Sequence, residues 1–323
     1  QHVRKEESMP TLADVAKRAN VSKMTVSRVI NHPEQVTDEL KELVFSAMAE
    51  LDYRPNIAAK ALVTNRSQII KLFILEEIDT TEPYYMNLLM GIAKRIGKAH
   101  YSLQLVTNDA FDVGSCDGYI ITGVRKKDFD WIDRLEKPVV LFGENSEGYD
   151  YVDSDNEYGT AKATQYALER DYQTIIYIGI EVDEPFEISR ETGYLSVMKE
   201  VDLPSKILRF PNHSTEVERY MTENWADFTD KTCFVCSSDR LALGAVRGII
   251  NAGGHLPEEF GVIGFDGVFL DQISSPKLTT IKQDIIRMGE VCGEMLLKKI
   301  EEKGASQGYR RFFPELVIRE TTN

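Results

Sequence analysis

The sequence lacks the long apolar runs, the cysteine content and the basic excess that mark several common protein classes. No stretch approaches the ~18–20 apolar residues that cross a bilayer. The opening residues, QHVRKEES, lack the apolar core of a secretory signal. Four cysteines in 323 residues are too few for a disulfide framework, so we expect a reducing, cytoplasmic setting. The rest of the composition is that of an ordinary globular protein of two or three domains.

A net charge of −14 argues against a polyanionic partner, but the charge is unevenly spread. Residues 1–68 hold 10 Lys and Arg against 9 Asp and Glu, whereas the remainder is strongly acidic. A polyanion is therefore predicted to bind the N-terminal tenth of the chain, because the rest would repel it. The cations of residues 9–32 are Lys17, Arg18, Lys23 and Arg28, opposed by Asp14 alone.

Residues 11–52 carry the spacing of three short helices. Thr11 and Asp14 have capping-box spacing, and Ser22 and Thr37 can cap the second and third helices. Only three or four residues join the first two helices, which predicts a helix-turn-helix. The apolar residues that recur at helical spacing are Leu12, Val15, Ala16, Ala19, Val26, Val29, Ile30, Leu40, Leu43, Val44, Ala47, Met48 and Leu51.

The second helix is predicted to expose short hydroxyls, cations and one apolar side chain. In a major groove, hydroxyls reach phosphate oxygens, Lys and Arg reach base acceptors, and Met can touch a thymine methyl. An ordinary solvated helix face is the alternative interpretation. The exposed set is Ser22, Lys23, Met24, Thr25, Ser27 and Arg28.

Two segments of this region resemble the LacI/GalR family of transcriptional regulators. One is TLADVAKRANVS at residues 11–22 with TVSRVIN at 25–31, and the other is YRPNIAAKAL at 53–62. The resemblance implies that the second helix lies in the major groove, where Arg28 reads a base. The implied DNA-binding residues are Thr11, Ser22, Lys23, Met24, Thr25, Ser27, Arg28, Asn31, Lys60 and Leu62.

Residues 55–67 are predicted to be a hinge that contains a short helix. Residues 57–63 favour a helix, but isolated helices under ~12–15 residues are marginal in water. The resemblance implies that two such helices, one from each chain of a homodimer, pair in the minor groove. Leu62 then wedges between base pairs and Lys60 lies near phosphate. The alternative is a plain interdomain linker.

From residue 68 onward, buried-strand runs alternate with helical segments. This alternation predicts an α/β body of two parallel-sheet lobes, with ligands at the carboxyl ends of the strands. The resemblance implies a periplasmic-binding-protein-like pair of lobes. The predicted strands are 69–75, 101–106, 118–122, 139–142, 174–179, 207–210, 233–236 and 261–265, and the predicted helices are 85–99, 157–170, 191–199, 216–224, 239–251 and 285–302.

The chain is thus divided into four parts. Met9 is the expected natural start, with residues 1–8 as an extension. Residues 9–54 form the helix-turn-helix domain, residues 55–67 the hinge, and residues 68–323 the effector-binding and dimerisation domain.

One crossover of the body is predicted to be short. Only about eleven residues separate strand 101–106 from strand 118–122, and a helical crossover normally needs at least ~10–12 with its loops. At most one turn is expected between residues 107 and 117, with altered dimer packing there. With this short crossover and the residues Glu82–Tyr85, the chain resembles one branch of the family, that of EbgR and the lactic-acid-bacterial galactose-operon repressors.

The resemblance also implies effector-binding residues in the cleft. Tyr84 and Tyr85 offer aromatic faces to a sugar ring, Arg190 donates to ligand oxygens, and Asp266 can accept from two hydroxyls. Core packing is the alternative for the tyrosines, and a structural salt bridge for Arg190 and Asp266. The implied set is completed by His213, Ser238 and Glu144.

The sequence contains none of the common motifs of enzymes or metal sites that we considered. It carries no dinucleotide or phosphate loop, no serine-hydrolase elbow and no zinc-protease motif. Cys233 and Cys236 lie in a predicted strand, so we expect buried thiols rather than a redox pair or zinc site. Asp239 is expected to cap the helix that follows it. No catalytic role, cofactor or metal is predicted.

The expected function is therefore a DNA-binding transcriptional regulator, a repressor that acts as a homodimer on a pseudo-palindromic operator. A small saccharide in the cleft would control it, with galactose or a galactoside first and sucrose-like sugars next. A phosphocarrier protein is left open as a co-regulator. The alternatives are a sugar-binding receptor and an α/β sugar-processing enzyme.

Overall fold

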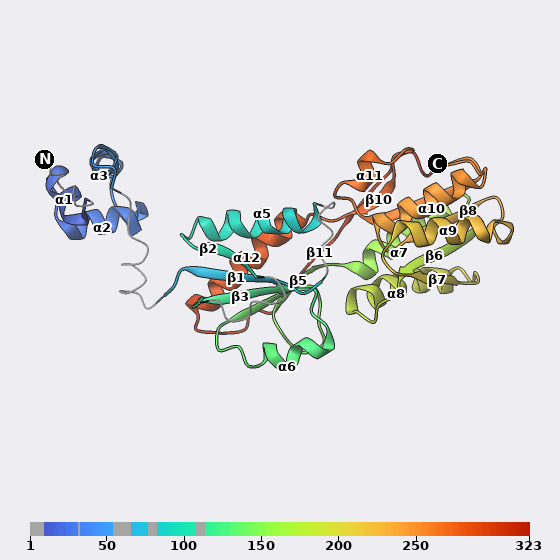
Figure 1. The fold of residues 1–323 in the computed structure, drawn as a ribbon, viewed down its shortest axis with the longest axis horizontal. Coiled ribbons are helices and arrows are strands. Elements are labelled where there is room, and N and C mark those ends of the chain that lie inside the picture. Colours follow the sequence, from blue (N-terminus) through green and yellow to red (C-terminus); the bar gives the residue numbers. More distant parts are fainter. Residues whose placement is uncertain (1–9, 32, 54–65, 77–82, 107–113) are drawn as a thin grey trace, which may run out of the picture. The chain divides into compact units, whose positions relative to one another are not determined.

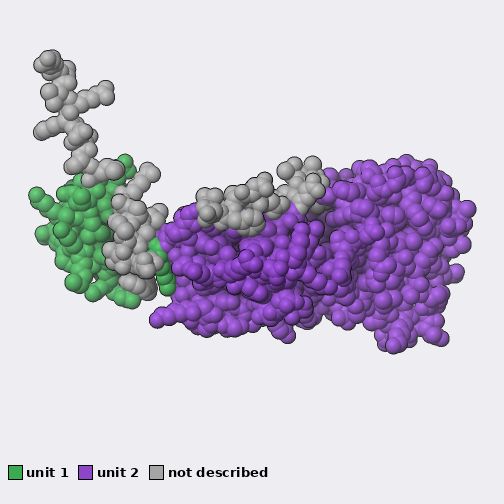
Figure 2. All heavy atoms as spheres, turned by 60° about the horizontal axis from the view of Figure 1, so that its bottom comes forward, with its two compact units in different colours: residues 1–66 green, residues 67–323 purple. Residues whose placement is uncertain are grey.

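The chain divides into two compact units, residues 1–66 and 67–323, which Figure 2 colours separately. The computed structural model describes residues 10–31, 33–53, 66–76, 83–106 and 114–323. The predicted hinge residues Lys60 and Leu62 lie outside the described residues.

The first unit contains the three predicted helices. At the start of α1, the amide and hydroxyl of Thr11 donate to the Asp14 carboxylate at 2.8 and 2.7 Å, which confirms the capping box. The apolar faces of all three helices meet in one core that includes Val15, Val26 and Val44. The elements are α1 (Leu12–Arg18), α2 (Lys23–Asn31), the 3-10 turn η1 (Pro33–Gln35) and α3 (Asp38–Glu50).

Leu43 belongs to the apolar pattern of α3 but does not lie in this core. Its side chain is 49% exposed, whereas Val44 and Ala47 are buried. Neighbouring residues on a helix point about 100° apart. Because α3 turns Val44 and Ala47 inward, Leu43 lies at the edge of the buried face.

The first lobe of the second unit is a parallel sheet with the strand order β11-β5-β4-β3-β1-β2. Helices α5 and α12 pack together over one face, and Figure 1 shows α6 on the other side of the sheet. The two helices approach so closely that a Cβ on Gly91 would lie 2.1 Å from the Ile286 carbonyl oxygen. The elements are β1 (Ile69–Ile74), α5 (Tyr84–Gly97), β2 (Ser102–Val106), β3 (Gly118–Thr122), η2 (Lys126–Asp128), α6 (Phe129–Ile132), β4 (Val139–Phe142), β5 (Tyr151–Ser154), α12 (Ile285–Glu301) and β11 (Tyr309–Phe312).

The second lobe repeats this plan with the strand order β12-β10-β9-β8-β6-β7, in which only β12 is antiparallel to its neighbour among the described strands. Residues of α7 and α8 share one buried cluster with the sheet, and those of α9 and α10 share another. The elements are α7 (Asn156–Glu169), β6 (Thr174–Ile180), α8 (Pro185–Glu200), β7 (Lys206–Phe210), α9 (Ser214–Glu223), η3 (Trp225–Asp227), β8 (Thr232–Cys236), α10 (Asp239–Asn251), β9 (Phe260–Asp266), α11 (Leu270–Ile273), β10 (Thr279–Lys282) and β12 (Glu315–Val317).

The chain passes between the lobes three times, from β5 to α7, from β10 to α12 and from β11 to β12. The crossings are joined by hydrogen bonds. The Ser154 hydroxyl donates to the Gln283 side chain at 2.5 Å, and the Asp155 amide donates to the Phe312 carbonyl at 2.8 Å. The two-lobed parallel body that the sequence predicted is confirmed.

Several details differ from the sequence-based expectations. The cap of α10 is Ser238, whose hydroxyl accepts from the Leu241 amide at 3.2 Å, and not Asp239. The Asp239 carboxylate instead accepts from the Thr280 hydroxyl at 2.5 Å and the Gly267 amide at 2.9 Å. Helix α8 begins at Pro185, well before the predicted residue 191, because proline suits the first turn of a helix.

The predicted short crossover falls largely outside the described residues, and its described part, residues 114–117, contains no helix. Cys233 and Cys236 lie buried on β8 as free thiols, as expected. Among the described helices, none is both long enough and apolar enough to cross a membrane.

Candidate DNA-binding face and effector pocket

The outer face of α2 presents the side chains that the sequence singled out. Lys23, Met24 and Arg28 are exposed, and 70% of the surface of Met24 is accessible to solvent. On the inner face, Val26 and Val29 are fully buried and so fix the rotation of the helix. The exposed face therefore offers two cations beside one apolar side chain.

The hydroxyls at the start of α2 form a small network. The Ser22 hydroxyl accepts from the Thr25 amide at 3.0 Å and shares a hydrogen bond of 2.8 Å with the Thr25 hydroxyl. Ser22 is exposed, and Thr25 and Ser27 are half-buried. Thr11 is exposed at the start of α1, where it forms the capping box. The Asn31 side chain lies outside the described part of the chain.

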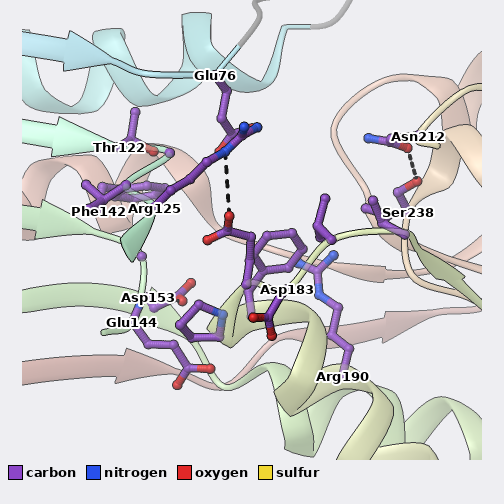
Figure 3. A pocket seen from close by; sticks show the side chains of 18 of the residues that line it. Glu76, Thr122, Arg125, Phe142, Glu144, Asp153, Asp183, Arg190, Asn212 and Ser238 are labelled. Atoms are coloured by element: carbon purple, nitrogen blue, oxygen red, sulfur yellow. Dashed lines mark hydrogen bonds and ion pairs between the residues drawn. The ribbon is translucent and has the colours of Figure 1, made fainter. Parts of the chain in front are cut away.

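A pocket of about 840 Å³ lies between the two lobes, at the carboxyl ends of their parallel strands. Thr122 and Phe142 end β3 and β4 on one side, and Asn212 and Ser238 belong to the second lobe on the other (Figure 3). Open α/β sheets bind their ligands at this edge. All the residues predicted to bind the effector line this one pocket: Tyr84, Tyr85, Glu144, Arg190, His213, Ser238 and Asp266.

Several contacts hold Arg190 in the lining of this pocket. Its Nε donates to Asn156 Oδ1 at 2.9 Å, and its Nη1 donates to the Ser237 carbonyl at 2.5 Å. Its guanidinium group also lies over the ring of Phe265, 3.7 Å from the centroid. A buried arginine with several fixed contacts is positioned in advance for a ligand oxygen.

Asp266 has an unusual backbone at the end of β9. Its φ is +118°, which is rare for a residue other than glycine. The Gln283 side chain donates to Asp266 Oδ1 at 2.9 Å, and Arg190 Nη2 lies 3.9 Å from the same atom. Such strain persists where the surroundings fix it, and it gathers at ligand sites. The contact between Arg190 and Asp266 also supports the alternative interpretation, in which the two residues form a structural salt bridge.

Two carboxylates extend the polar lining on the side of the first lobe. Glu144 accepts from the Ser189 hydroxyl of α8 and from Arg311 at 3.2 Å, so it joins the two lobes. Asp153, which the sequence did not indicate, accepts from the amides of Glu144 and Ser154 at 2.8 and 2.7 Å. Burial raises the pKa of Asp153 to about 6, although these hydrogen bonds oppose the shift.

Two ion pairs cross the pocket between loops of the two lobes. Arg125 Nε lies 3.6 Å from Glu184 Oε1, and Lys126 Nζ lies 3.1 Å from Asp183 Oδ2. Figure 3 shows Arg125 and Asp183 extending into the space between the lobes. No local pattern in the sequence could indicate these pairs, because the partners are more than fifty residues apart.

The remaining predicted residues come from both lobes. Tyr84 and Tyr85 begin α5 with their ring centroids 5.3 Å apart in an edge-on arrangement. Burial raises the pKa of both phenols well above the usual value, so they stay neutral donors. His213 is exposed just before α9, and the Ser238 hydroxyl donates to Asn212 Oδ1 at 2.8 Å. Among the described residues, no cluster of three or more His, Cys, Asp or Glu could hold a metal ion.

Comparisons with known proteins agree with this two-part organisation. Residues 11–56 match the family model of bacterial regulatory proteins, lacI family, and residues 164–322 match that of a periplasmic binding protein-like domain. The chain is 54% identical over 315 residues to the uncharacterized HTH-type transcriptional regulator YvdE of Bacillus subtilis (strain 168). That alignment covers 97% of this chain and 100% of the relative.

Two solved structures show the same fold over almost the whole chain. One is the lac repressor dimer bound to operator and the anti-inducer ONPF, with a TM-score of 0.74, 22% identity, and coverage of 98% of this chain and 99% of that one. The other is the complex of the transcriptional regulator CelR with cellobiose, with a TM-score of 0.71, 24% identity, and coverage of 97% and 99%. Given the close relative and the matched N-terminal model, this chain belongs to the LacI family of DNA-binding transcriptional regulators.

Proposed function

We propose that this regulator is a homodimeric repressor whose affinity for a pseudo-palindromic operator is controlled by a small saccharide bound between its lobes. The observation that carries the proposal is the pocket, in which aromatic rings, an arginine and carboxylates converge from both lobes. A ligand that touches both lobes binds some arrangements of the lobes more tightly than others. It can therefore shift the dimer between states of different operator affinity.

The DNA contacts in this proposal come from α2 and its surroundings. Arg28 reads a base, Lys23 and Met24 set the operator preference, and the hydroxyls of Thr11, Ser22, Thr25 and Ser27 reach phosphates. Asn31 is included in the same surface, and Lys60 and Leu62 contact the minor groove. The exposed cations and the exposed Met24 support this arrangement.

The charge pattern of the pocket favours an uncharged ligand. Each cation among the described lining residues already has a partner: Arg125 has Glu184, Lys126 has Asp183, Arg190 has Asp266, and Arg240 donates to the Asn212 carbonyl. The carboxylates of these pairs would repel the phosphate group of a phosphorylated sugar. The carboxylates and carbonyls, in contrast, can accept hydrogen bonds from hydroxyl groups.

The size of the pocket suggests a ligand larger than one sugar ring. Pockets for drug-sized ligands span about 300–1,000 Å³, and this one lies in the upper part of that range. A galactoside is our leading candidate, ahead of free galactose, and sucrose-like or other saccharides follow. The CelR complex, which holds cellobiose in the same fold, supports a saccharide of this size.

The finer family branch is also a proposal. Residues 82–85 and the short sequence between β2 and β3 support a place near EbgR and the lactic-acid-bacterial galactose-operon repressors. That placement is the basis for testing galactosides first.

The DNA part is tested by selecting duplexes from a randomised oligonucleotide pool with the full chain. The logarithm of the binding constant for the recovered duplex should fall steeply with the logarithm of the salt concentration, because binding releases several counterions from the DNA. Recovery of no enriched sequence, or a flat salt dependence, would contradict the proposal.

The effector part is tested by a thermal-shift screen with galactose, lactose, melibiose, sucrose, cellobiose and galactose 6-phosphate. A neutral galactoside is expected to raise the melting temperature, and the phosphorylated sugar is not. Asp266→Ala should abolish the shift, with Asp284→Ala, at the cap of α12 and outside this lining, as the control. A shift that survives Asp266→Ala unchanged would place the ligand elsewhere.

A further inference from the structure

One carboxylate holds the point where the chain enters the second unit. Asp117 Oδ1 accepts from the Ser67 amide at 2.9 Å and from the Ser67 hydroxyl at 3.1 Å, and Oδ2 accepts from the Gln68 amide at 2.8 Å. Asp117 and Gln68 are both buried, and Gln68 has a left-handed φ of +54°. One side chain thus holds two consecutive residues, and the second of them, Gln68, has a backbone conformation that residues other than glycine rarely adopt.

The backbone around this junction adds further contacts. The Asp117 amide donates to the Ile69 carbonyl at 2.9 Å, and the Ser102 amide donates to the Gln68 carbonyl at 2.9 Å. The buried Lys71 ammonium donates to the Gly114 carbonyl at 2.7 Å. The entry segment is therefore tied both to β2 and to the residues just before β3.

The same two strands that begin at this junction end at the pocket. β1 starts at Ile69, and Glu76, shortly after its end, lines the pocket; β3 starts at Gly118 and ends at Thr122, another lining residue. The strands are parallel neighbours, with Ile70 beside Gly118 and Ile74 beside Thr122. They lie side by side in the sheet, between β4 and the edge strand β2 (Figure 1).

We propose that Asp117 is a positioning residue for operator binding, which anchors the connection to the DNA-binding unit on the lobe that senses the effector. Residues before Ser67 are the covalent route between the two units. A movement at the pocket edge of β1 and β3 can reach the DNA-binding unit only if the first lobe holds that route. The proposal rests on the DNA-binding function, and its link to the effector rests on the function proposed above.

The physical consequence of losing the anchor follows from dimer geometry. Two DNA-binding units on one dimer bind a palindrome tightly because the second binding event is intramolecular, and its effective concentration falls as the connection lengthens. Releasing Ser67 and Gln68 adds these two residues to the chain that joins the units, because the first lobe no longer holds them, and it removes the fixed direction in which the chain enters the lobe. Operator affinity is therefore expected to fall, while the pocket itself is unchanged.

The chain supplies a matched control in the same lobe. Asp150 Oδ1 likewise accepts from the Ser306 hydroxyl at 2.6 Å. It also accepts from the consecutive amides of Gln307 and Gly308 at 3.0 and 2.8 Å. That carboxylate anchors the loop between α12 and β11, which does not lead to the DNA-binding unit. Asp150→Asn also removes an ion pair of Asp150 Oδ2 with Lys299 Nζ at 2.5 Å, so it is the more severe change of the two and a stringent control for general destabilisation of this lobe.

The experiment measures the dissociation constant of the full chain for the duplex recovered from the randomised pool, together with the melting temperature of each variant. Asp117→Asn is expected to weaken duplex binding by at least ~5-fold, the lower range of an allosteric coupling, and Asp150→Asn by less than about 2-fold. Both should lower the melting temperature. Equal losses of duplex affinity, or no loss in Asp117→Asn, would overturn the proposal.

A milder variant covers the case in which Asp117→Asn does not fold. Ser67→Ala removes one of the three donors, and it should reproduce part of the loss of affinity. Where Asp117→Asn does fold, the losses of the two single variants should not add in the double variant, because both act through the same contact. Full additivity, or wild-type affinity in Ser67→Ala, would argue against the anchor. If the wild-type chain recovers no duplex, the DNA-binding function fails instead.

Discussion

The guanidinium group of Arg190 lies over the ring of Phe265, the residue directly before Asp266 on β9. The aromatic face holds the flat cation 3.9 Å from the Asp266 carboxylate, while Asn156 and Ser237 take two of its donors. One strand end therefore positions two of the charged groups of the pocket. The arrangement depends on a planar cation, because stacking and several directed donors are needed at once.

Arg190→Lys is therefore expected to weaken saccharide binding although the charge is kept. The lysine ammonium is a point charge that cannot stack on Phe265 and donate in the same directions. Loss of one or two charge-assisted hydrogen bonds predicts about tenfold to hundredfold weaker binding, measured by calorimetry with the sugar that the screen identifies. Arg209→Lys is the control, since Arg209 pairs with Glu191 at the surface. Equal affinities for wild type and Arg190→Lys would contradict the positioning argument.

The sequence predicted the fold well where elements are long and strongly patterned. The three helices of the first unit and α10 were placed to within a residue or two, because caps and apolar spacing mark them locally. The strands β5, β10, β11 and β12 were missed. Each has only three or four residues and includes polar side chains, whereas the equally short β4 is wholly apolar and was predicted. Their pairing also depends on the crossings between lobes.

The candidate site was predictable in part for the same reason. Residues carried over from the family resemblance meet in one pocket, but Asp153 lies on an unpredicted strand and gave no signal. The pairs of Arg125 with Glu184 and Lys126 with Asp183 arise only when two lobes face each other. Contacts that depend on tertiary geometry leave no local trace in the sequence.

The raised pKa of Asp153 predicts a pH-dependent stability. Burial makes ionisation costly in the folded state, so the native pKa of about 6 lies above that of the unfolded chain. Below about pH 4 the carboxyl is protonated in both states, so its burial does not lower the free energy of unfolding. The loss of unfolding free energy grows as the pH rises to about 6, and above that pH it is constant at ~3 kcal/mol. Wild type should therefore lose stability relative to Asp153→Asn as the pH rises from 4 to 7.

Urea unfolding of both proteins at several pH values measures this difference. Asp155→Asn is a suitable control for a nearby carboxylate, since Asp155 caps α7 through the Tyr158 amide. A constant difference between wild type and Asp153→Asn across this range would show that the carboxyl titrates normally.

The ion pairs across the pocket predict a salt-dependent release of the effector. Arg125 and Glu184 hold the two lobes together at the pocket, and such partly exposed pairs contribute about 0.5 kcal/mol. Glu184→Gln should therefore speed release of the sugar about two- to threefold at low salt. The effect should shrink at 1 M salt, where charges are screened beyond ~3 Å.

Stopped-flow fluorescence of the two tryptophans can follow this release. Glu191→Gln is the control, because its partner Arg209 belongs to the same lobe. A rate increase in Glu184→Gln that persists unchanged at high salt would point to a steric rather than an electrostatic cause.

Arg28 is expected to carry sequence discrimination rather than general attraction to DNA. It is exposed on α2, one turn beyond Met24, and an arginine that bonds a guanine edge contributes ~1–3 kcal/mol of discrimination. Arg28→Ala should therefore weaken binding to the selected duplex far more than binding to random-sequence DNA. Lys41→Ala, which removes a cation paired with Asp38 on α3, should change the ratio of the two affinities little. Fluorescence anisotropy with both duplexes at one salt concentration gives that ratio directly. If Arg28→Ala reduced both affinities equally, Arg28 would contact phosphate, and base recognition would have to come from Lys23 and Met24.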